Sequence, residues 1–156
     1  MANTTFTGND YGSNIFQLGA GAETVNGGAR SNVYQASSDT GQAEIILPGA
    51  AGARNELGFL GGITDEQLWF ERSGDDLKID LLGTNTDITV KNWFTGNSIQ
   101  MQEITAGGLK LDNQVAQLVQ AMASYSAANP GFDPTQVTQM LPDPTLQSAI
   151  AASWHH

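Results

Sequence analysis

The sequence contains no cysteine, and its only two histidines are the last two residues, His155 and His156. The chain therefore forms no disulfide and lacks the thiolate ligands of zinc and iron–sulfur sites. Without a thiol or an imidazole in the body of the chain, cysteine nucleophiles and histidine-dependent serine triads are excluded. The two histidines are either a tag remnant or the native terminus, and we favour the tag.

Basic residues are also scarce, with six Lys and Arg against 16 Asp and Glu, which gives a formal net charge of -10. Nucleic acids and anionic membrane surfaces are bound mainly through Lys and Arg, so we expect neither as a partner. The sequence contains no phosphate-binding loop and no G-x-S-x-G elbow, and no carboxylate pair stands out. We therefore expect that the protein is not an enzyme. The acidic balance suits contact with cations such as calcium, which prefers oxygen ligands.

Long hydrophobic runs are absent too. No apolar stretch approaches the roughly 20 residues of a membrane-spanning helix, so we expect no membrane span. The first ten residues, MANTTFTGND, lack the basic and apolar regions of a cleaved secretory signal. If the protein leaves the cell, we expect it to use another route.

The most regular feature is a repeat of nine residues in the run NDYGSNIFQLGAGAETVNGGARSNVYQ, residues 9 to 35. Each of the three segments has a polar residue at its sixth position and a large apolar residue at its eighth. These residues are Asn14, Glu23 and Asn32 at the sixth position, and Phe16, Val25 and Tyr34 at the eighth. A nonapeptide period with turn glycines and a core-facing apolar residue is typical of a parallel β-roll, in which aspartates at the sixth position bind calcium.

The chain divides into three regions of different character. Residues 1–62 are rich in Gly, Ala, Asn, Ser and Thr and predict short strands between tight turns, a degenerate β-roll. Residues 63–110 alternate apolar and polar side chains and predict an antiparallel β-meander of about four strands, the last at Ile99 and Met101. Residues 111–154 predict a helical cap, and residues 155–156 are the possible tag. The expected fold class is mainly β, with two or three C-terminal α-helices.

The helical prediction depends on spacing and on capping residues. Apolar residues follow the i, i+3, i+4, i+7 pattern from Val115 to Met122, with Asp112 or Asn113 as the cap. Asp133 and Asp143 each precede a proline, which is the combination of N-cap and first helical residue that starts a helix. We therefore expect two short helices after the first one.

On these motifs the chain resembles the C-terminal region of RTX (repeats-in-toxin) haemolysin-type calcium-binding proteins. The three nonapeptides carry part of the likeness. The segment GGITDEQLWFERSGDDLKIDLLGTNTDITVKNWF, residues 61 to 94, is similar to the haemolysin-type calcium-binding related domain that follows such repeats. The tail, LVQAMASYSAANPGF through AIAASW, is similar to the C-terminal ends of large RTX proteins.

The resemblance implies a secreted, extracellular protein. Members of this family leave the cell through type I secretion machinery, guided by an uncleaved signal near the C-terminus, and fold outside, where calcium is abundant. The chain would then be a non-enzymatic module that serves export, extracellular folding and capping of a β-roll. The alternative is a self-standing extracellular binding or assembly protein that uses a β-roll scaffold to meet a protein partner or a second copy of itself.

For calcium, the resemblance and the residues give different expectations. The family pattern implies ions between stacked turns, with Asp10, Asn14, Glu23 and Asn32 as the candidate ligands. However, the sixth position holds no aspartate, and amide oxygens contribute no charge, which is a main determinant of calcium affinity. The residues therefore predict a weak site or none. The alternative role for these side chains is to stabilise turns by hydrogen bonds to nearby backbone.

Overall fold

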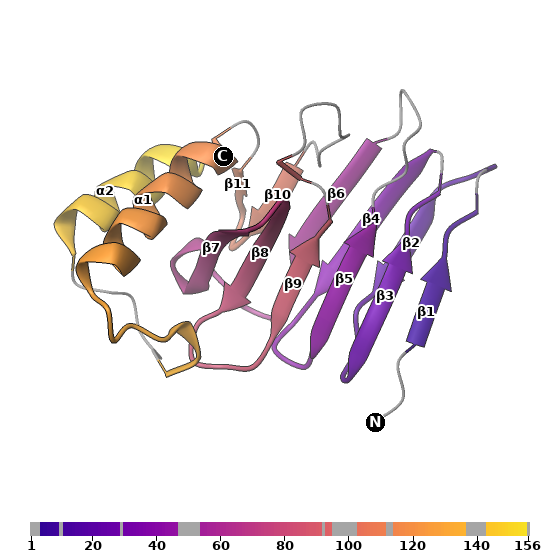
Figure 1. Cartoon of the computed structure of the whole chain (residues 1–156). Helices are drawn as coiled ribbons and strands as arrows, with labels where there is room; N and C mark the ends of the chain where they lie inside the picture. Colours follow the sequence, from indigo (N-terminus) through magenta and orange to yellow (C-terminus); the bar gives the residue numbers. More distant parts are fainter. Residues whose placement is uncertain are drawn as a thin grey trace.

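The computed structural model describes residues 4–9, 11–28, 30–46, 54–91, 93–94, 103–111, 114–136 and 143–155. Two mixed sheets face each other, and two α-helices from the C-terminal part of the chain lie at one end of them (Figure 1). The prediction of a mainly β chain with C-terminal helices is confirmed. The predicted meander strand at Ile99 and Met101 lies outside the described residues.

The strands divide between a six-stranded and a five-stranded sheet. Sheet A has the order β1 (Thr4–Thr7), β3 (Ala22–Asn26), β5 (Gln42–Ile46), β9 (Asp87–Val90), β8 (Asp76–Leu81) and β7 (Leu68–Ser73). Sheet B has the order β11 (Leu109–Leu111), β10 (Glu103–Ala106), β6 (Arg54–Phe59), β4 (Ser31–Ala36) and β2 (Asn14–Gln17). The helical elements are the 3₁₀ turns η1 (Asp65–Gln67) and η2 (Pro134–Gln136) and the α-helices α1 (Val115–Ala128) and α2 (Pro144–Ser153).

The first six strands alternate between the two sheets, and neighbours within each sheet run parallel. A strand therefore pairs with the second strand after it: Phe16 lies opposite Tyr34, 18 residues or two repeats later, and Val25 lies opposite Ile45, 20 residues later. Tyr34 and Val25 are fully buried, whereas Phe16 is half-buried and stacks on the ring of Tyr34 with a centroid distance of 5.2 Å. One strand from each sheet with its two turns is called a coil below.

Residues 63–110 complete both sheets. The strands β7, β8 and β9 are antiparallel to one another, and Gly74 occupies the hairpin tip with a φ of 63°, which suits glycine. At its other edge β9 pairs in parallel with β5. The strand β10 pairs in parallel with β6 and in antiparallel with β11, and the sequence analysis predicted neither β10 nor β11. The two regions thus share their sheets and one hydrophobic core.

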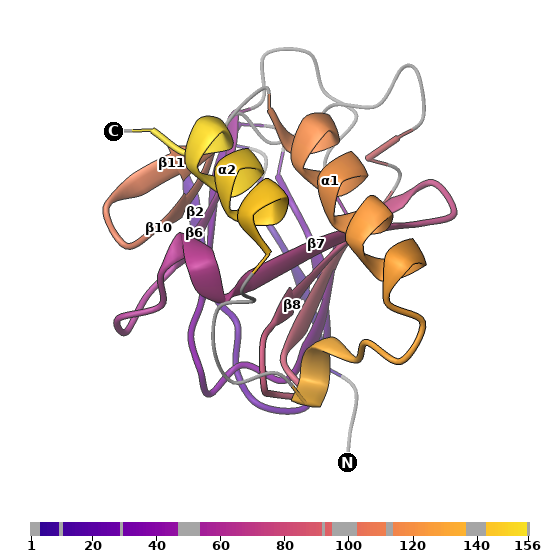
Figure 2. The same ribbon diagram turned by 90° about the vertical axis from the view of Figure 1, so that its left-hand side faces the viewer.

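The helices cover one end of the paired sheets. In Figure 2, α1 and α2 lie side by side across the end formed by β7 and β11. The predicted apolar stripe of α1 is buried, and the sulfur of Met122 accepts a hydrogen bond from the backbone N–H of Phe70 at 3.0 Å. No helix within the described ranges is both long and apolar enough to cross a bilayer.

The two predicted capping aspartates have different outcomes. Asp143 caps α2 as expected, because its Oδ1 accepts hydrogen bonds from the backbone N–H groups of Thr145 and Leu146. Asp133 precedes only the single 3₁₀ turn η2, and residues 137–142 lie outside the described part of the chain. Asp112 and Asn113, the predicted caps of α1, also lie outside it.

Candidate functional site

The structure brings two of the predicted metal ligands together in an amide column. Asn14, Asn32 and Asn55 occupy equivalent positions on β2, β4 and β6 and lie opposite one another in register. Nδ2 of Asn14 donates to Oδ1 of Asn32 at 3.0 Å, and Nδ2 of Asn32 donates to Oδ1 of Asn55 at 2.9 Å. Both Asn32 and Asn55 are fully buried. We call these three residues the amide ladder.

All three sixth-position side chains also bind the turn that precedes their own strand. Oδ1 of Asn14 accepts a hydrogen bond from the N–H of Asn9 at 2.9 Å, and Oδ1 of Asn32 accepts one from Gly28 at 2.9 Å. Glu23 does the same on sheet A, where its Oε1 accepts from the N–H of Gly19 at 2.6 Å. The side chains therefore stabilise turns, as the alternative interpretation of the sequence expected.

Glu23 does not join the two asparagines. It lies on β3, opposite Thr4 and Ala43, and its side chain is 8% exposed. Asp10, the fourth candidate ligand, lies outside the described residues. Among the residues that are described, no three Asp, Glu or His side chains gather in a group that could hold a metal ion.

Asn55 is the ladder residue that the sequence analysis missed. It follows Asn32 by 23 positions, whereas Asn32 follows Asn14 by 18, so a search at a fixed period passes over it. The available signal was the local pattern of an asparagine two residues before a large apolar residue. That pattern occurs at Asn14–Phe16, Asn32–Tyr34 and Asn55–Leu57.

The turns of successive coils are in direct contact. The N–H of Gly8 donates to the carbonyl of Asn26 at 2.7 Å, and the N–H of Gly41 donates to that of Gly19 at 3.0 Å. A Cβ added at Gly28 would lie 2.3 Å from the carbonyl oxygen of Asn9, and one at Gly41 would lie 2.6 Å from the backbone of Gly21. The glycines thus permit a close approach of the turns. The carbonyl oxygens of Asn26 and Gly19 already accept hydrogen bonds from the backbone of a neighbouring turn.

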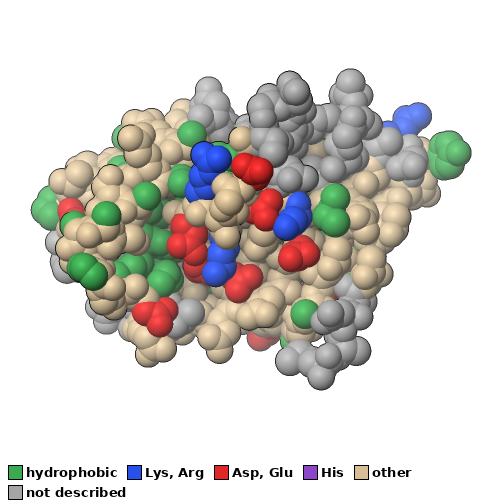
Figure 3. Space-filling view, in the orientation of Figure 1, with side chains coloured by type: hydrophobic (Ala, Val, Ile, Leu, Met, Phe, Trp, Pro, Cys, Tyr) green, Lys and Arg blue, Asp and Glu red, His purple; other side chains and the backbone are tan. Residues whose placement is uncertain are grey.

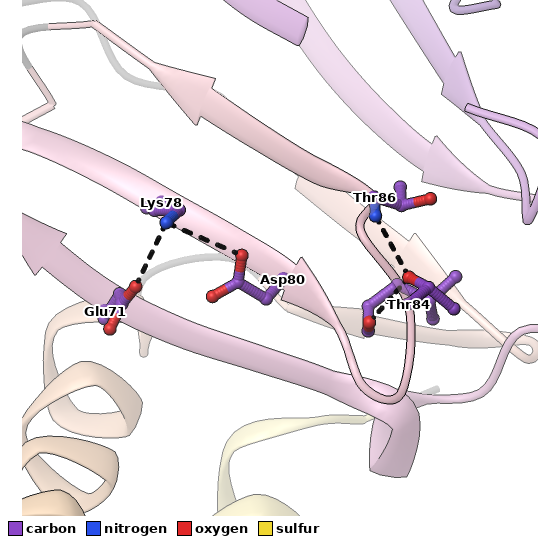
Figure 4. Close-up of polar contacts among 6 residues, drawn as sticks. Glu71, Lys78, Asp80, Thr84 and Thr86 are labelled. Atoms are coloured by element: carbon purple, nitrogen blue, oxygen red, sulfur yellow. Dashed lines mark hydrogen bonds and ion pairs between the residues drawn. The ribbon is translucent and has the colours of Figure 1, made fainter. Parts of the chain in front are cut away.

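A second polar group lies on the outer face of sheet A. Lys78 lies between Glu71 and Asp80, with its Nζ 3.7 Å from a carboxylate oxygen of Glu71 and 3.9 Å from one of Asp80 (Figure 4). Asp87 lies opposite Asp80 on the neighbouring strand. The pKa of Asp80 is raised to about 7, and burial is the main cause. Lys78 opposes the rise, whereas the carboxylates of Glu71 and Asp87 add to it. Burial also raises the pKa of Asp87.

This cluster borders a shallow hollow of about 510 Å³ over β3, β5, β9 and β8. Charged side chains of both signs gather over this face of the molecule (Figure 3). Lys91 contributes to the lining, and the Asp76 carboxylate, 2.8 Å from its Nζ, raises the pKa of Lys91. Asp80 could exchange a proton near neutral pH, but it is only 6% exposed, so little of it is accessible to a substrate.

The two ends of the paired sheets differ. At the end that we call the open end, β1 and β2 are the edge strands, and the side chains of Phe6, Tyr11 and Ile15 are 40%, 88% and 68% exposed. Phe6 and Ile15, with Phe16 and Gln17, line a small hollow of about 110 Å³ there. At the opposite end, which we call the closed end, α1 packs on β7 and α2 packs on α1 (Figure 2).

No protein-family model matches the chain.

Proposed function

We propose that the chain is a non-enzymatic RTX-type C-terminal module that closes a parallel β-roll and that a type I apparatus exports for folding outside the cell. The observation that carries the proposal is the difference between the two ends. A module that terminates a stack of β-roll coils needs one end that accepts a further coil and one end that accepts none. The open end and the closed end fit these two roles.

The closed end is sealed by apolar contacts. The ring of Trp69 on β7 lies 4.5 Å from that of Phe132 and 5.8 Å from that of Tyr125, measured between centroids. Trp154, which follows α2, lies 6.2 Å from the ring of Phe70. Aromatic pairs at such distances contribute roughly 0.5–1.5 kcal/mol each beyond their buried area. These contacts keep further strands from the edge at β7.

The edge strands of the open end lack two of the common devices that protect a sheet edge, namely charged side chains and proline. The strand β1 has the sequence TTFT and β2 has the sequence NIFQ, so neither carries a charge or a proline. Natural edge strands are commonly blocked by lysine, proline or a covering element, because unpaired backbone groups otherwise recruit another strand. An uncharged edge beside exposed Phe6 and Ile15 suits the addition of another coil.

The finer fold assignment, a short degenerate β-roll, belongs to the same proposal. It is supported by parallel strands that alternate between the two sheets. It is also supported by the pairing of β2 with β4, whose partner residues are 18 positions, or two repeats, apart. In this β-roll the amide ladder and the directly stacked turns supply the cohesion between coils. Calcium then binds weakly or not at all, because Oδ1 of Asn32 already accepts hydrogen bonds from Gly28 and Asn14.

Export is tested with the full chain fused behind a reporter protein, in cells with and without a type I apparatus. We expect the reporter in the medium only when the apparatus is present, and retention when residues 112–154 are deleted. Since Leu118 and Met122 are core residues, the deletion also disturbs folding. The matched control is Leu118→Ala with Met122→Ala, which loosens the cap but keeps the tail, and we expect it to be exported.

Release that is unaffected by the deletion would refute the export part of the proposal. The alternative, a self-standing assembly protein, has its own signature. Sedimentation of the isolated chain would then show a concentration-dependent dimer that Ile15→Lys abolishes, because Ile15 is exposed on β2. A chain that stays monomeric at high concentration favours the capping module.

A further inference from the structure

The amide ladder has a direction. Each described donor points from an earlier coil to a later one, from Asn14 to Asn32 and from Asn32 to Asn55. The orientation of the first two amides is fixed by backbone, because Asn9 and Gly28 donate their N–H groups to the Oδ1 atoms of Asn14 and Asn32. A flipped amide would place an NH₂ group against each of those backbone donors. The ladder therefore has a donor side and an acceptor side.

Asn14 is the first member and lies at the open end. Both hydrogens of its Nδ2 are used, one by the carbonyl of Asn9 at 2.9 Å and one by Oδ1 of Asn32. Among the described residues, Oδ1 of Asn14 accepts a single hydrogen bond, from Asn9. An amide oxygen accepts two, and Oδ1 of Asn32 does so. The acceptor position of Asn14 that corresponds to the one filled in Asn32 faces the open end.

We propose that the coil received at the open end presents a side-chain amide, an asparagine in register with Asn14, which donates to the Oδ1 of Asn14. This inference rests on the proposed function, and it names the partner of the open end by its chemistry. A parallel strand added beside β2 lies about 4.8 Å away, which is the spacing that lets in-register amides meet. Asn14 and Asn32 meet in this way, because they lie opposite each other on the paired parallel strands β2 and β4.

Other occupants of the open end do not fit the ladder. An aspartate has no hydrogen to donate when ionised, so its oxygens would face the Oδ1 of Asn14 as acceptor against acceptor. A second copy placed by a twofold axis pairs β2 with β2 in antiparallel, or sets β1 opposite β2. In the first arrangement Asn14, at the start of β2, lies opposite the end of the second copy's β2 and far from its Asn14. In the second arrangement Asn14 lies opposite a strand of sheet A, which carries no ladder residue. Neither arrangement continues the column.

The test adds one coil to the complete chain. A copy of residues 19–36 is joined directly before Met1, which places the copy of Asn32 18 residues before Asn14, the separation found within the ladder. The same copy supplies a strand for each sheet, because β3 and β4 lie within it. The comparison chains carry Asn32→Asp or Asn32→Ala in the copy only. Hydrogen exchange of the β1 and β2 backbone amides is followed with a calcium chelator present.

We expect the unaltered copy to slow exchange in both β1 and β2. In β2, Asn32→Ala in the copy should lower the added protection about fivefold, because one hydrogen bond is lost. Asn32→Asp in the copy should lower it about tenfold or more, because repulsion between two acceptors then replaces that hydrogen bond. A double-mutant cycle with Asn14→Ala in the host chain separates this bond from the turn that the copied asparagine also stabilises. The two changes should be coupled, so that Asn32→Ala in the copy has little effect once Asn14 is alanine.

The possible results separate the two proposals. If every copy protects β1 and β2 equally, the coil docks without the amide, which overturns the inference and leaves the proposed function standing. If no copy slows exchange while the aromatic circular dichroism of the closed end stays native, the open end accepts no coil, and the proposed function fails with the inference. Protection by the unaltered copy alone supports both.

Discussion

Replacing Asn32 by aspartate should destabilise the protein strongly when no metal is present. The Asn32 side chain is fully buried, and its Nδ2 lies 2.9 Å from the carbonyl oxygen of Gly28 and 2.9 Å from Oδ1 of Asn55. In Asn32→Asp an oxygen replaces this nitrogen, so both acceptors lose their donor and face a lone pair. Each buried acceptor left without a partner costs about 1–3 kcal/mol.

For two acceptors the expected loss in the free energy of unfolding near neutral pH is about 2–6 kcal/mol, and the buried charge places it in the upper half of that range. This is a large share of the roughly 5–15 kcal/mol that stabilises a typical domain. In acid the loss should be smaller, because a protonated carboxyl group can donate one hydrogen to one of the two acceptors. Urea unfolding followed by tryptophan fluorescence, in chelator, measures both values.

The matched control is Asn14→Asp, because Asn14 is half-buried at the open end and water can reach its side chain. We expect a loss of about 1–2 kcal/mol there. Adding millimolar calcium should leave the wild type unchanged, since a ligand stabilises only the state that binds it. An Asn32→Asp protein as stable as the wild type in chelator would refute the ladder as the cohesive element. So would a wild type that unfolds in chelator and refolds with calcium.

Two further predictions concern sheet A and the stacked turns. The native pKa of Asp80, about 7, exceeds its ordinary value of 3.8, so the native state binds the proton more tightly than the unfolded state. The free energy of unfolding should therefore fall, by about 4 kcal/mol at most, as the pH rises from about 4 to about 8. Asp80→Asn should flatten this slope in urea titrations, and a wild type without the slope contradicts the assignment. Gly41→Ala should lower the free energy of unfolding by about 1–3 kcal/mol, because the added Cβ would lie 2.6 Å from the backbone of Gly21. The control is Gly12→Ala, which has open space around it and should change the free energy of unfolding by less than about 0.5 kcal/mol. Equal thermal melts of the two variants would disprove close turn stacking.

The local features of this fold follow from the sequence because they depend on short-range physics. A nine-residue period returns an apolar residue to the same side of each strand, so Val25 and Tyr34 are buried as predicted. The alternation from Leu68 to Val90 identified β7, β8 and β9, because a strand with one buried face needs that pattern. Asp143 was predictable as a cap because its bonds reach only two and three residues along the chain.

The candidate site depended on contacts that no local pattern encodes. The hydrogen bond from Asn32 to Asn55 spans 23 residues, and the irregular spacing conceals it from a period search. The parallel pairing of β9 with β5 and of β10 with β6 results from competition among all strands for the available edges. Asp80 is buried because it lies opposite Trp69 in the sheet, and η2 contacts its strand.

The sequence by itself determined which side chains turn inward, where the chain turns and that helices follow the strands, since propensity and periodicity act within a few residues. Only the tertiary structure decided that the sixth-position amides bind one another and that, within the described part of the chain, the helices cover one end of the sheets and not the other. Those outcomes depend on the stacking of whole coils and on the packing of α1 against β7. Such long-range contacts form only when segments distant in sequence fold together, because each segment is held in place by the apolar surface that it buries against the other.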